Sequence, residues 1–415
     1  MQSNKLSILR ATGVFAVISG LALALACGGG SSGSNTPPNT IVPSGPNVQA
    51  LSLNSGLNGN YANGVFTSVT VCVPGTSTCQ TINDILVDTG SIGLRLFSTS
   101  VAGQLNLSLP VENDSSNNPI GECTQFLDGS FIWGAVRTAD IKLSSETANS
   151  VPINVLGDPA VSTIPASCSN GGTNGNSPQS FGANGVLGLN VFPQDCGNFC
   201  VSGMMPPAGF YYSCPNTGCV SAFVPLTQQV MNPVPLFATD HNGYIIELPS
   251  VPSSGAVSTT GSLVFGIGTQ SNNALTGATV FPLDSSGLFT STFKGKGYSF
   301  SFLDTGSNGF FFLDTATTGI ATCADLQNQF YCPSSTTMIT ATNQSSVNPS
   351  ISKNVTFSVA NTDNLFNSPN FLFSNLAGPN PQSFDWGLPF YFGRNVYEAI
   401  EGQNTSGGAG PYVAY

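Results

Sequence analysis

Short hydrophobic runs, separated by Gly, Asn, Ser and Pro, follow one another along most of this 415-residue chain. Examples are residues 64–73 (GVFTSVTVCV), 135–143 (AVRTADIKL), 242–249 (NGYIIELP) and 261–268 (GSLVFGIG). Runs that are rich in β-branched and aromatic residues and bounded by turn formers are typical of strands. Helical spacing is scarce, and PLTQQVMNPV and TCADLQNQF are the best short candidates. The pattern predicts an all-β protein.

Two of these runs end in the same acidic turn. Residues 82–97 (INDILVDTGSIGLRLF) and 298–313 (YSFSFLDTGSNGFFFL) both pass into Asp-Thr-Gly-Ser and reach a second Gly soon afterwards. Each copy is followed by an apolar run that Gly interrupts, at residues 184–192 (NGVLGLNVF) and 384–392 (FDWGLPFYF). The repeated order indicates a duplication and predicts two comparable lobes.

Length and composition agree with this organisation, because a chain of this length exceeds one ordinary core. Charged residues make up 7% of it, against roughly 25% in an average soluble domain. The hydrophobic content of 40% and the aromatic content of 10% are too high for a disordered chain. The predicted units are a signal segment, a tether, an N-terminal lobe, a C-terminal lobe and a tail: residues 1–26, 27–48, 49–235, 236–402 and 403–415.

The charge balance is acidic. Nine basic residues face 20 acidic ones, and two of the nine, Lys5 and Arg10, lie in the signal segment. Such a surface repels nucleic acid and anionic headgroups, so we expect no nucleic-acid partner.

The N-terminus resembles the export signal of a bacterial lipoprotein. Residues 11–26 are apolar, follow a positively charged start and are too short to span a membrane comfortably. They end in LALAC, which resembles a lipobox that places a lipid on Cys27, and a Gly- and Ser-rich tether follows. Gly28 stands where Asp would favour the inner membrane, so we expect an anchor in the outer membrane of the cell envelope. The alternative is a plain secretory signal with a chance cysteine.

Ten cysteines remain beyond Cys27, an even number that predicts disulfides in an oxidising compartment. The expected local bridges are Cys72–Cys79 and Cys323–Cys332, with Cys123–Cys168 across a longer loop. Two further bridges among the remaining four have open connectivity, and zinc binding is the alternative for these four: Cys196, Cys200, Cys214 and Cys219.

Elimination leaves carboxylates as the candidates for chemistry. His241 is the only histidine and lies in a turn-like context, so it is expected to be solvated. One histidine rules out a multi-histidine zinc site, and no phosphate-binding loop with Lys is present. Two carboxyls held about 3 Å apart share one proton, so one can activate water while the other donates to a carbonyl oxygen. Such a dyad titrates as a pair, works best at acidic pH and needs no cofactor or metal.

The Asp-Thr-Gly-Ser turn suits this geometry. Gly lets the backbone pass close to a carboxylate, Ser can bond its outer oxygen, and Thr can reach the opposite loop. The hypothesis requires Asp88 and Asp304 to lie within about 6 Å of each other. The alternatives are an Asx-turn and a calcium loop, which Ile92 in the place of Asn308 disfavours. The supporting residues are Thr89, Gly90, Ser91, Thr305, Gly306 and Ser307.

These motifs resemble the two active-site loops of pepsin-like aspartic peptidases, and the similarity extends over roughly residues 50–402. Residues 126–143 (FLDGSFIWGAVRTADIKL) resemble that family's flap hairpin, and residues 260–268 (TGSLVFGIG) the hairpin that opens its second lobe. The chain is also similar to a bacterial lipoprotein family of unknown function with the same two motifs. The resemblance implies a bilobal pepsin-like acid protease fold: two pseudo-symmetric, β-barrel-like lobes with the active-site cleft between them.

The chain departs from the peptidase pattern at several positions. Phe126 replaces the flap Tyr and Arg95 replaces the Trp that it would contact. Arg95 is expected either to pair with Asp128 or to be a solvated charge at the rim. Asp385 replaces an apolar residue before Gly387, which puts the packing of that strand in question. The candidate flap and substrate-binding residues are Phe126, Asp128, Gly129, Ser130 and Trp133, the last of which could pack in the core instead.

The sequence therefore predicts an aspartic endopeptidase that acts on extended peptides or unfolded protein, as a monomer that touches the membrane only through its lipid. The alternative, favoured by the altered flap, is a non-catalytic lipoprotein that binds peptides or surfaces and retains the fold.

Overall fold

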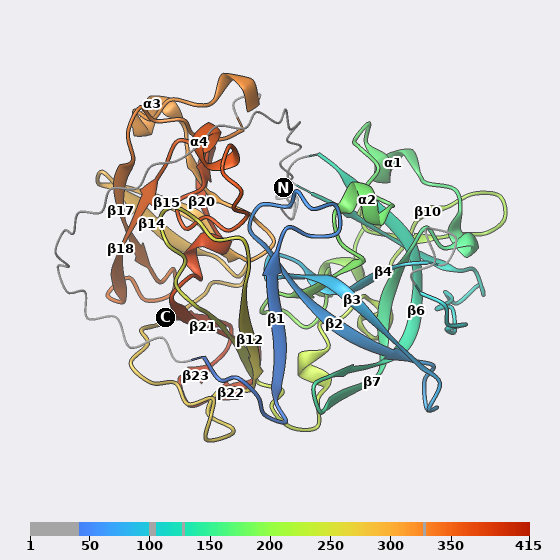
Figure 1. Ribbon diagram of the computed structural model, residues 1–415. Coiled ribbons are helices and arrows are strands. Elements are labelled where there is room, and N and C mark those ends of the chain that lie inside the picture. Colours follow the sequence, from blue (N-terminus) through green and yellow to red (C-terminus); the bar gives the residue numbers. More distant parts are fainter. Residues whose placement is uncertain (1–40, 99–104, 127–128, 327–328) are drawn as a thin grey trace.

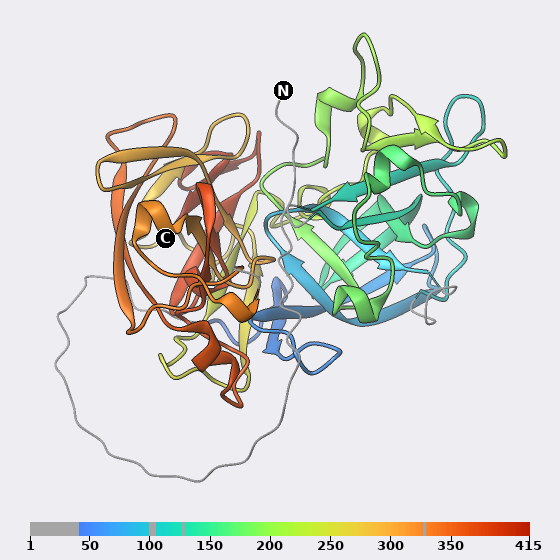
Figure 2. The ribbon, with the colours of Figure 1, turned by 90° about the horizontal axis from the view of Figure 1, so that it is seen from above.

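The structure is a computed structural model that describes residues 41–415 apart from 99–104, 127–128 and 327–328 (Figure 1). Strands account for 44% of it and helices for 10%, which confirms the prediction of an all-β protein. Seen from above, the chain forms two bodies, one from its first half and one from its second (Figure 2).

The first body is a closed barrel of six strands. Its strands β2 and β3 are joined by the disulfide Cys72–Cys79 at their tips, and the β2–β6 pairing closes the circle. The alternating pattern of β2 sends Val65, Val69 and Val71 into the core. Around the barrel, the order is β2 (Gly64–Cys72), β3 (Cys79–Asp88), β8 (Gly185–Leu189), β4 (Ile92–Phe97), β7 (Glu146–Leu156) and β6 (Phe131–Leu143).

The same sheet extends beyond the barrel on both sides. Beyond β6 lie β5 (Ile120–Gln125), β9 (Tyr211–Ser213) and β10 (Val220–Ser221). Beyond β2 lies an antiparallel group that we call the platform: β1 (Val48–Asn54), β12 (Thr259–Phe265), β11 (Gly243–Leu248), β21 (Arg394–Ala399), β24 (Tyr412–Ala414) and β13 (Val280–Pro282).

The platform joins the two halves of the sequence, because β1 pairs along its length with β12, between the two bodies (Figure 1). It also corrects the expectation of a C-terminal tail at residues 403–415. β24 pairs with both β21 and β13, and Tyr412 and Tyr415 are buried. Because these aromatic side chains pack in the sheet, the end of the chain is part of the fold.

The second body is a seven-stranded sheet that forms a half-barrel. Its core is aromatic, with Phe310, Phe312, Phe384 and Trp386 in mutual ring contact. In order across the sheet, its strands are β18 (Ser352–Val359), β17 (Thr337–Gln344), β14 (Phe289–Phe293), β15 (Lys296–Asp304), β20 (Asn380–Gly387), β16 (Phe310–Leu313) and β19 (Ala377–Gly378).

The described helices are all short. The first helix candidate of the sequence contains the single 3-10 turn η3 (Leu226–Gln228), because Asn232 and Pro233 interrupt the segment. The described part of the second candidate contains the 3-10 turn η5 (Ala324–Leu326). The other helical turns are α1 (Ala166–Ser169), α2 (Pro178–Phe181), α3 (Thr315–Thr318), α4 (Thr362–Phe366), η1 (Pro159–Val161), η2 (Gly197–Cys200), η4 (Val234–Leu236) and η6 (Leu388–Phe390), and a small hairpin joins β22 (Asn404–Thr405) to β23 (Gly408–Ala409).

Five disulfides cross-link the chain, which indicates an exported protein. The three predicted bridges are confirmed, and the open connectivity resolves into two short-range bridges, so the alternative zinc site has no free thiols. The pairs are Cys72–Cys79, Cys123–Cys168, Cys196–Cys200, Cys214–Cys219 and Cys323–Cys332. In the described part of the chain, no helix has the length and apolar character needed to cross a membrane.

Candidate active site

The two Asp-Thr-Gly-Ser turns sit in the same three-strand unit, built once in each body. Asp88 ends β3, which pairs in parallel with β8, and Asp304 ends β15, which pairs in parallel with β20. The register is equivalent, because Asp88 lies opposite Gly188 and Asp304 opposite Gly387. After each turn the chain returns antiparallel to the same partner, as β4 and β16. The structure thus brings together both landmarks of the predicted duplication.

The two threonines of the motifs hold the units together by reciprocal hydrogen bonds. The backbone N–H of Thr89 donates to Oγ1 of Thr305, and the N–H of Thr305 donates to Oγ1 of Thr89, both at 3.1 Å. The Thr305 hydroxyl in turn donates to the carbonyl oxygen of Val87 at 2.8 Å. Both threonines are buried, so these bonds act without competition from solvent and fix the turns against each other.

The glycines of the motifs allow each turn to approach the other aspartate. A Cβ on Gly90 would lie 2.6 Å from Cγ of Asp304. A Cβ on Gly306 would lie 2.5 Å from Oδ1 of Asp88 and 3.0 Å from Oδ1 of Asp304. Because one point is that close to both oxygens, their separation cannot exceed the sum of these two lengths. The two carboxyls therefore meet within the limit that the dyad hypothesis sets.

Each carboxyl is held by its own turn. The Gly90 N–H donates to Oδ1 of Asp88 at 2.9 Å, and the Gly306 N–H donates to Oδ1 of Asp304 at 2.7 Å. The outer oxygens differ, because the Ser307 hydroxyl lies 3.0 Å from Oδ2 of Asp304. Oδ2 of Asp88 and the Ser91 hydroxyl are buried without a well-formed hydrogen bond among the described residues, although Ser91 is near enough to act to lower the pKa of Asp88.

Burial and proximity favour a proton at this junction. Asp88 is 1% exposed and Asp304 0%. Burial raises the pKa of Asp304 well above its usual value, and the neighbouring charges of Asp88 and Asp385 raise it further. Burial also raises the pKa of Asp88. Two carboxyls this close cannot both ionise, so the pair binds one shared proton.

A buried acid network lies beneath the first turn. The Thr89 hydroxyl is 3.0 Å from the Tyr391 hydroxyl, which is 3.0 Å from Oε1 of Glu398. Oε2 of Glu398 is 2.9 Å from the Tyr244 hydroxyl, which donates to the carbonyl oxygen of Leu189 at 2.7 Å. Burial raises the pKa of Glu398 to about 8. The network therefore rests on a neutral acid at neutral pH.

The second turn carries a further acid instead. Oδ2 of Asp385, on β20, lies 2.6 Å from the Ser307 hydroxyl that also contacts Asp304. Asp385 is 2% exposed, and burial raises its pKa well above the usual value. The sequence identified this position only as a departure from an apolar pattern. Its strand packing is intact, since Asp385 pairs in register with Phe302 and Phe311.

Arg95 is not the solvated rim charge that the sequence suggested. The alternative partner, Asp128, lies outside the described residues. Arg95 is 2% exposed, and its guanidinium is 3.1 Å from Glu122 and 3.2 Å from Asp195. Both acids come from other segments that fold over β4, which explains why no local pattern predicted these ion pairs. The positive charge of Arg95 acts to lower the pKa of Asp88.

Of the predicted flap residues, Phe126, Gly129 and Ser130 lie between β5 and β6, where the Phe126 N–H donates to the carbonyl oxygen of Ser130 and the Gly129 N–H to that of Phe126. Phe126 is buried and packs against Phe181. Trp133 is not at the dyad: it is 1% exposed, contacts Tyr212 and donates its indole N–H to the carbonyl oxygen of Val161. Its core position agrees with the second of the two roles considered for it. Cys27 lies outside the described residues.

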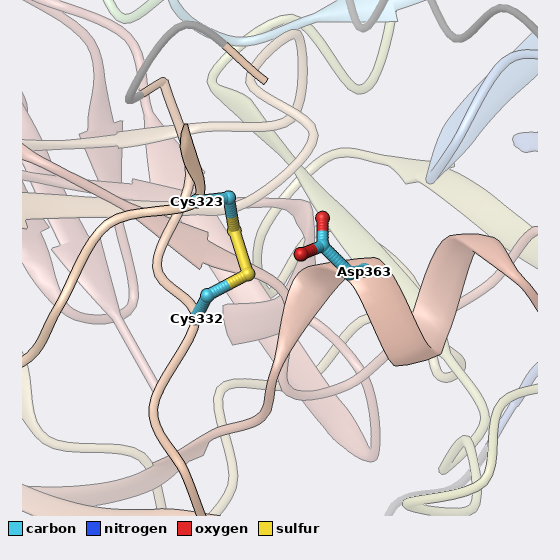
Figure 3. A group of neighbouring side chains, drawn as sticks. All are labelled: Cys323, Cys332 and Asp363. Carbon is cyan, nitrogen blue, oxygen red and sulfur yellow. A yellow bond between two sulfur atoms is a disulfide. The ribbon is translucent and has the colours of Figure 1, made fainter. Parts of the chain in front are cut away.

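The structure also places one predicted residue, His241, and one group of side chains that the sequence did not suggest. His241 is exposed in a turn, as predicted. Cys323, Cys332 and Asp363 lie together, with the carboxyl of Asp363 facing the sulfur atoms (Figure 3). Because the two cysteines are joined to each other in a disulfide, this group offers no thiolate ligands for a metal.

The residues that sequence reasoning missed are Tyr244, Tyr391 and Glu398. Each lies in or beside a platform strand, far along the chain from Thr89, so no motif links them to it. The one signal in the sequence was Glu398, an acid beside Val396, Tyr397 and Ala399 in β21. Such a signal is weak, because strands that contain one acid are common.

The fold and the site together define a class of protein: an all-β protein in which each half contributes one buried aspartate to a common junction. A family model described as "Protein of unknown function (DUF3443)" matches residues 43–415. The chain therefore belongs to this family. A search of curated proteins gave no match.

Proposed function

We propose that this protein is an aspartic endopeptidase with a pepsin-like bilobal fold, in which Asp88 and Asp304 form the catalytic dyad. The observation that supports this most is the reciprocal pair of threonine bonds, which sets two carboxyls from equivalent turns against each other. A structural Asx-turn would explain one such turn, but not two that meet in equivalent register.

The proposed reaction is the hydrolysis of a peptide bond by water. The ionised member of the dyad removes a proton from the attacking water, and the protonated member donates its proton to the carbonyl oxygen. The member that took the proton from water then gives it to the leaving amine as the C–N bond breaks, and the other member takes back its proton from a hydroxyl of the tetrahedral intermediate. No covalent enzyme intermediate forms. Extended peptide or unfolded protein would be the substrate, and backbone groups of the β5–β6 hairpin, with Gly129 and Ser130 at its tip, would bind it.

One observation favours the alternative of a non-catalytic binding protein. Both carboxyls are almost completely buried, and a peptide bond must reach them for catalysis. The two functions differ in a single experiment with the chain from residue 28 onward and its disulfides formed.

In this experiment the protein is incubated with unfolded protein between pH 3 and 7. The proposal expects cleavage in acid that a statine-type transition-state mimic blocks and that Asp88→Asn and Asp304→Asn each reduce by at least about 10³-fold. Glu401→Gln, at an exposed carboxylate, is the matched control and should cleave normally. Peptide binding without cleavage, unchanged by the substitutions at Asp88 and Asp304, would establish the binding protein instead.

We also propose that a lipid on Cys27 anchors the protein in the outer membrane. The support is the LALAC sequence and the tether that follows it. Cys27→Ala should move the protein from the membrane to the soluble fraction and abolish its metabolic labelling with palmitate. Unchanged fractionation and labelling would refute the anchor.

A further inference from the structure

Asp385 forms a chain of three groups with Ser307 and Asp304. The Ser307 hydroxyl oxygen lies 2.6 Å from Oδ2 of Asp385 and 3.0 Å from Oδ2 of Asp304. All three side chains are buried. The equivalent position in the first body, two residues before its landmark glycine, is Val186. This acid is therefore an addition to one half of a duplicated unit.

Proton counting shows that one of the two carboxyls in this chain is protonated. A serine hydroxyl carries one hydrogen and can donate it to only one acceptor. Ser307 contacts a carboxyl oxygen on each side, so one of these carboxyls must donate to Ser307 while Ser307 donates to the other.

The unpaired oxygen identifies Asp385 as the donor. Its Oδ1 is buried and has no hydrogen-bond partner among the described residues. A charged carboxylate oxygen left unpaired in the interior costs far more free energy than a neutral carbonyl oxygen. Asp304, in contrast, receives a hydrogen bond from the Gly306 N–H. The neutral acid is thus Asp385, and Ser307 donates to Oδ2 of Asp304.

No positive charge compensates for an ionised Asp385. The charged groups that face it are the dyad carboxyls Asp88 and Asp304. In the described part of the chain, the ion pairs are those of Arg95 and Arg137, and neither includes Asp385. Three acids therefore share one buried site, and ionisation of Asp385 would both turn the Ser307 hydrogen away from Asp304 and add a second negative charge.

We propose that Asp385 is a positioning residue of the dyad, a third acid that retains its own proton and through it keeps the Ser307 hydrogen bond directed at Asp304. The role of Asp385 in catalysis rests on the proposed function. The retention of a proton by Asp385 is independent of it. While Asp385 keeps its proton, the Ser307 hydrogen stays directed at Asp304 and no second negative charge reaches the dyad. The third acid thus keeps the dyad in its working arrangement until Asp385 itself ionises.

The first test measures the proton without using activity. Urea unfolding is followed between pH 4 and 7 for the wild type, Asp385→Asn and Asp385→Leu. An acid whose pKa is raised on folding stabilises the fold below its unfolded value near pH 4, and this contribution is lost as pH rises toward the folded value. The wild type should therefore lose stability with pH more steeply than both variants, by the equivalent of one proton. If the free energy of unfolding of the wild type and of the variants changes equally with pH, the proposal is overturned. If Asp385→Asn does not fold, the comparison of the wild type with Asp385→Leu gives the answer.

The second test measures the link to the dyad, through the pH profile of kcat/KM. Asp385→Asn can still donate to Ser307, so its optimum rate should stay within about threefold of the wild type. Its alkaline limb should move to higher pH, because the amide has no proton to lose and so cannot turn the Ser307 hydrogen away from Asp304. Asp385→Leu should lose rate as well. A limb that does not move in either variant would overturn the proposal, and Glu401→Gln is the control.

The two tests also separate the proposals from each other. If the wild type cleaves nothing, the peptidase proposal fails, while the unfolding slopes still decide whether Asp385 holds a proton.

Discussion

The two halves of the dyad stand on the same backbone but in different electrostatic surroundings. On the side of Asp88 lies a buried cation, Arg95, which acts to lower the pKa of its neighbour. On the side of Asp304 lies a buried acid, Asp385, whose charge would raise the pKa of Asp304 once Asp385 ionises. The strands and glycines are equivalent, so the difference comes from the side chains that the flanking segments add. A duplicated scaffold thus fixes where two carboxyls meet, whereas non-duplicated neighbours favour Asp304 as the member that carries the shared proton.

The largest effects should come from the features that the halves share. Gly90→Ala places a Cβ 2.6 Å from the Asp304 carboxyl, and Gly306→Ala places one 2.5 Å from that of Asp88. Both should push the carboxyls apart, at a cost of about 1–3 kcal/mol in the free energy of unfolding and a loss of about 100-fold or more in kcat/KM. Urea unfolding and peptide cleavage measure the two quantities. A full rate in either variant would show that the close approach is not needed.

Removal of the threonine hydroxyls should have a smaller effect than the glycine substitutions, and the effect should differ between the two halves. Thr89→Val and Thr305→Val keep the side-chain shape and each remove one hydroxyl, which leaves buried groups unpaired at about 1–3 kcal/mol. We expect Thr89→Val to be the more damaging, because its hydroxyl also contacts Tyr391. Thermal or urea unfolding of the single and double variants tests this. Because the hydroxyls serve the same junction, the double variant should lose less than the sum of the singles.

Glu398 provides a prediction in which a substitution stabilises the protein. Its pKa is raised to about 8 by burial, against about 4.3 when unfolded. The stability that this proton provides is complete below about pH 4 and declines as pH rises to about 8. Gln can make the same contacts to Tyr244 and Tyr391 without a proton to lose. Glu398→Gln should therefore unfold at higher urea than the wild type at pH 7, by up to about 3–4 kcal/mol, with little difference at pH 4. A lower stability at both pH values would contradict the protonated state.

The sequence contained enough to predict the junction itself. Asp88 and Asp304 stand in short motifs between apolar runs, and the landmark glycines follow in the same order, so local patterns carried the information. The disulfides within short loops were predictable for the same reason. An all-β fold followed from strand-like runs whose turn residues lie in the chain beside them.

The surroundings of the junction were not predictable, because they depend on contacts between distant segments. Arg95 pairs with acids 27 and 100 positions away, and Ser307 contacts Asp385 across 78 positions. Each of these side chains looks like an ordinary polar residue in its own strand. These side chains are buried because the strands of the barrel and of the half-barrel assemble around them. The alternation of apolar and polar residues within one strand does not predict that assembly. The prediction of a tail at residues 403–415 was wrong for the same reason, because the partners of β24 are the distant strands β21 and β13.

The smallest effect sharpens the comparison at a single pair of equivalent hydroxyls. The Ser91 hydroxyl has no well-formed hydrogen bond among the described residues, whereas that of Ser307 joins two acids. Ser91→Ala should change the free energy of unfolding by less than about 0.5 kcal/mol, and it should move the pH profile less than Ser307→Ala does, because Ser91 acts on the pKa of Asp88 alone. Ser307→Ala should cost about 1–3 kcal/mol and alter the alkaline limb. Because both substitutions remove one buried hydroxyl from the same motif, backbone and packing effects are matched. Equal responses in the two variants would mean that the acid on β20 does not distinguish the halves, and the asymmetry would then have to come from Arg95 alone.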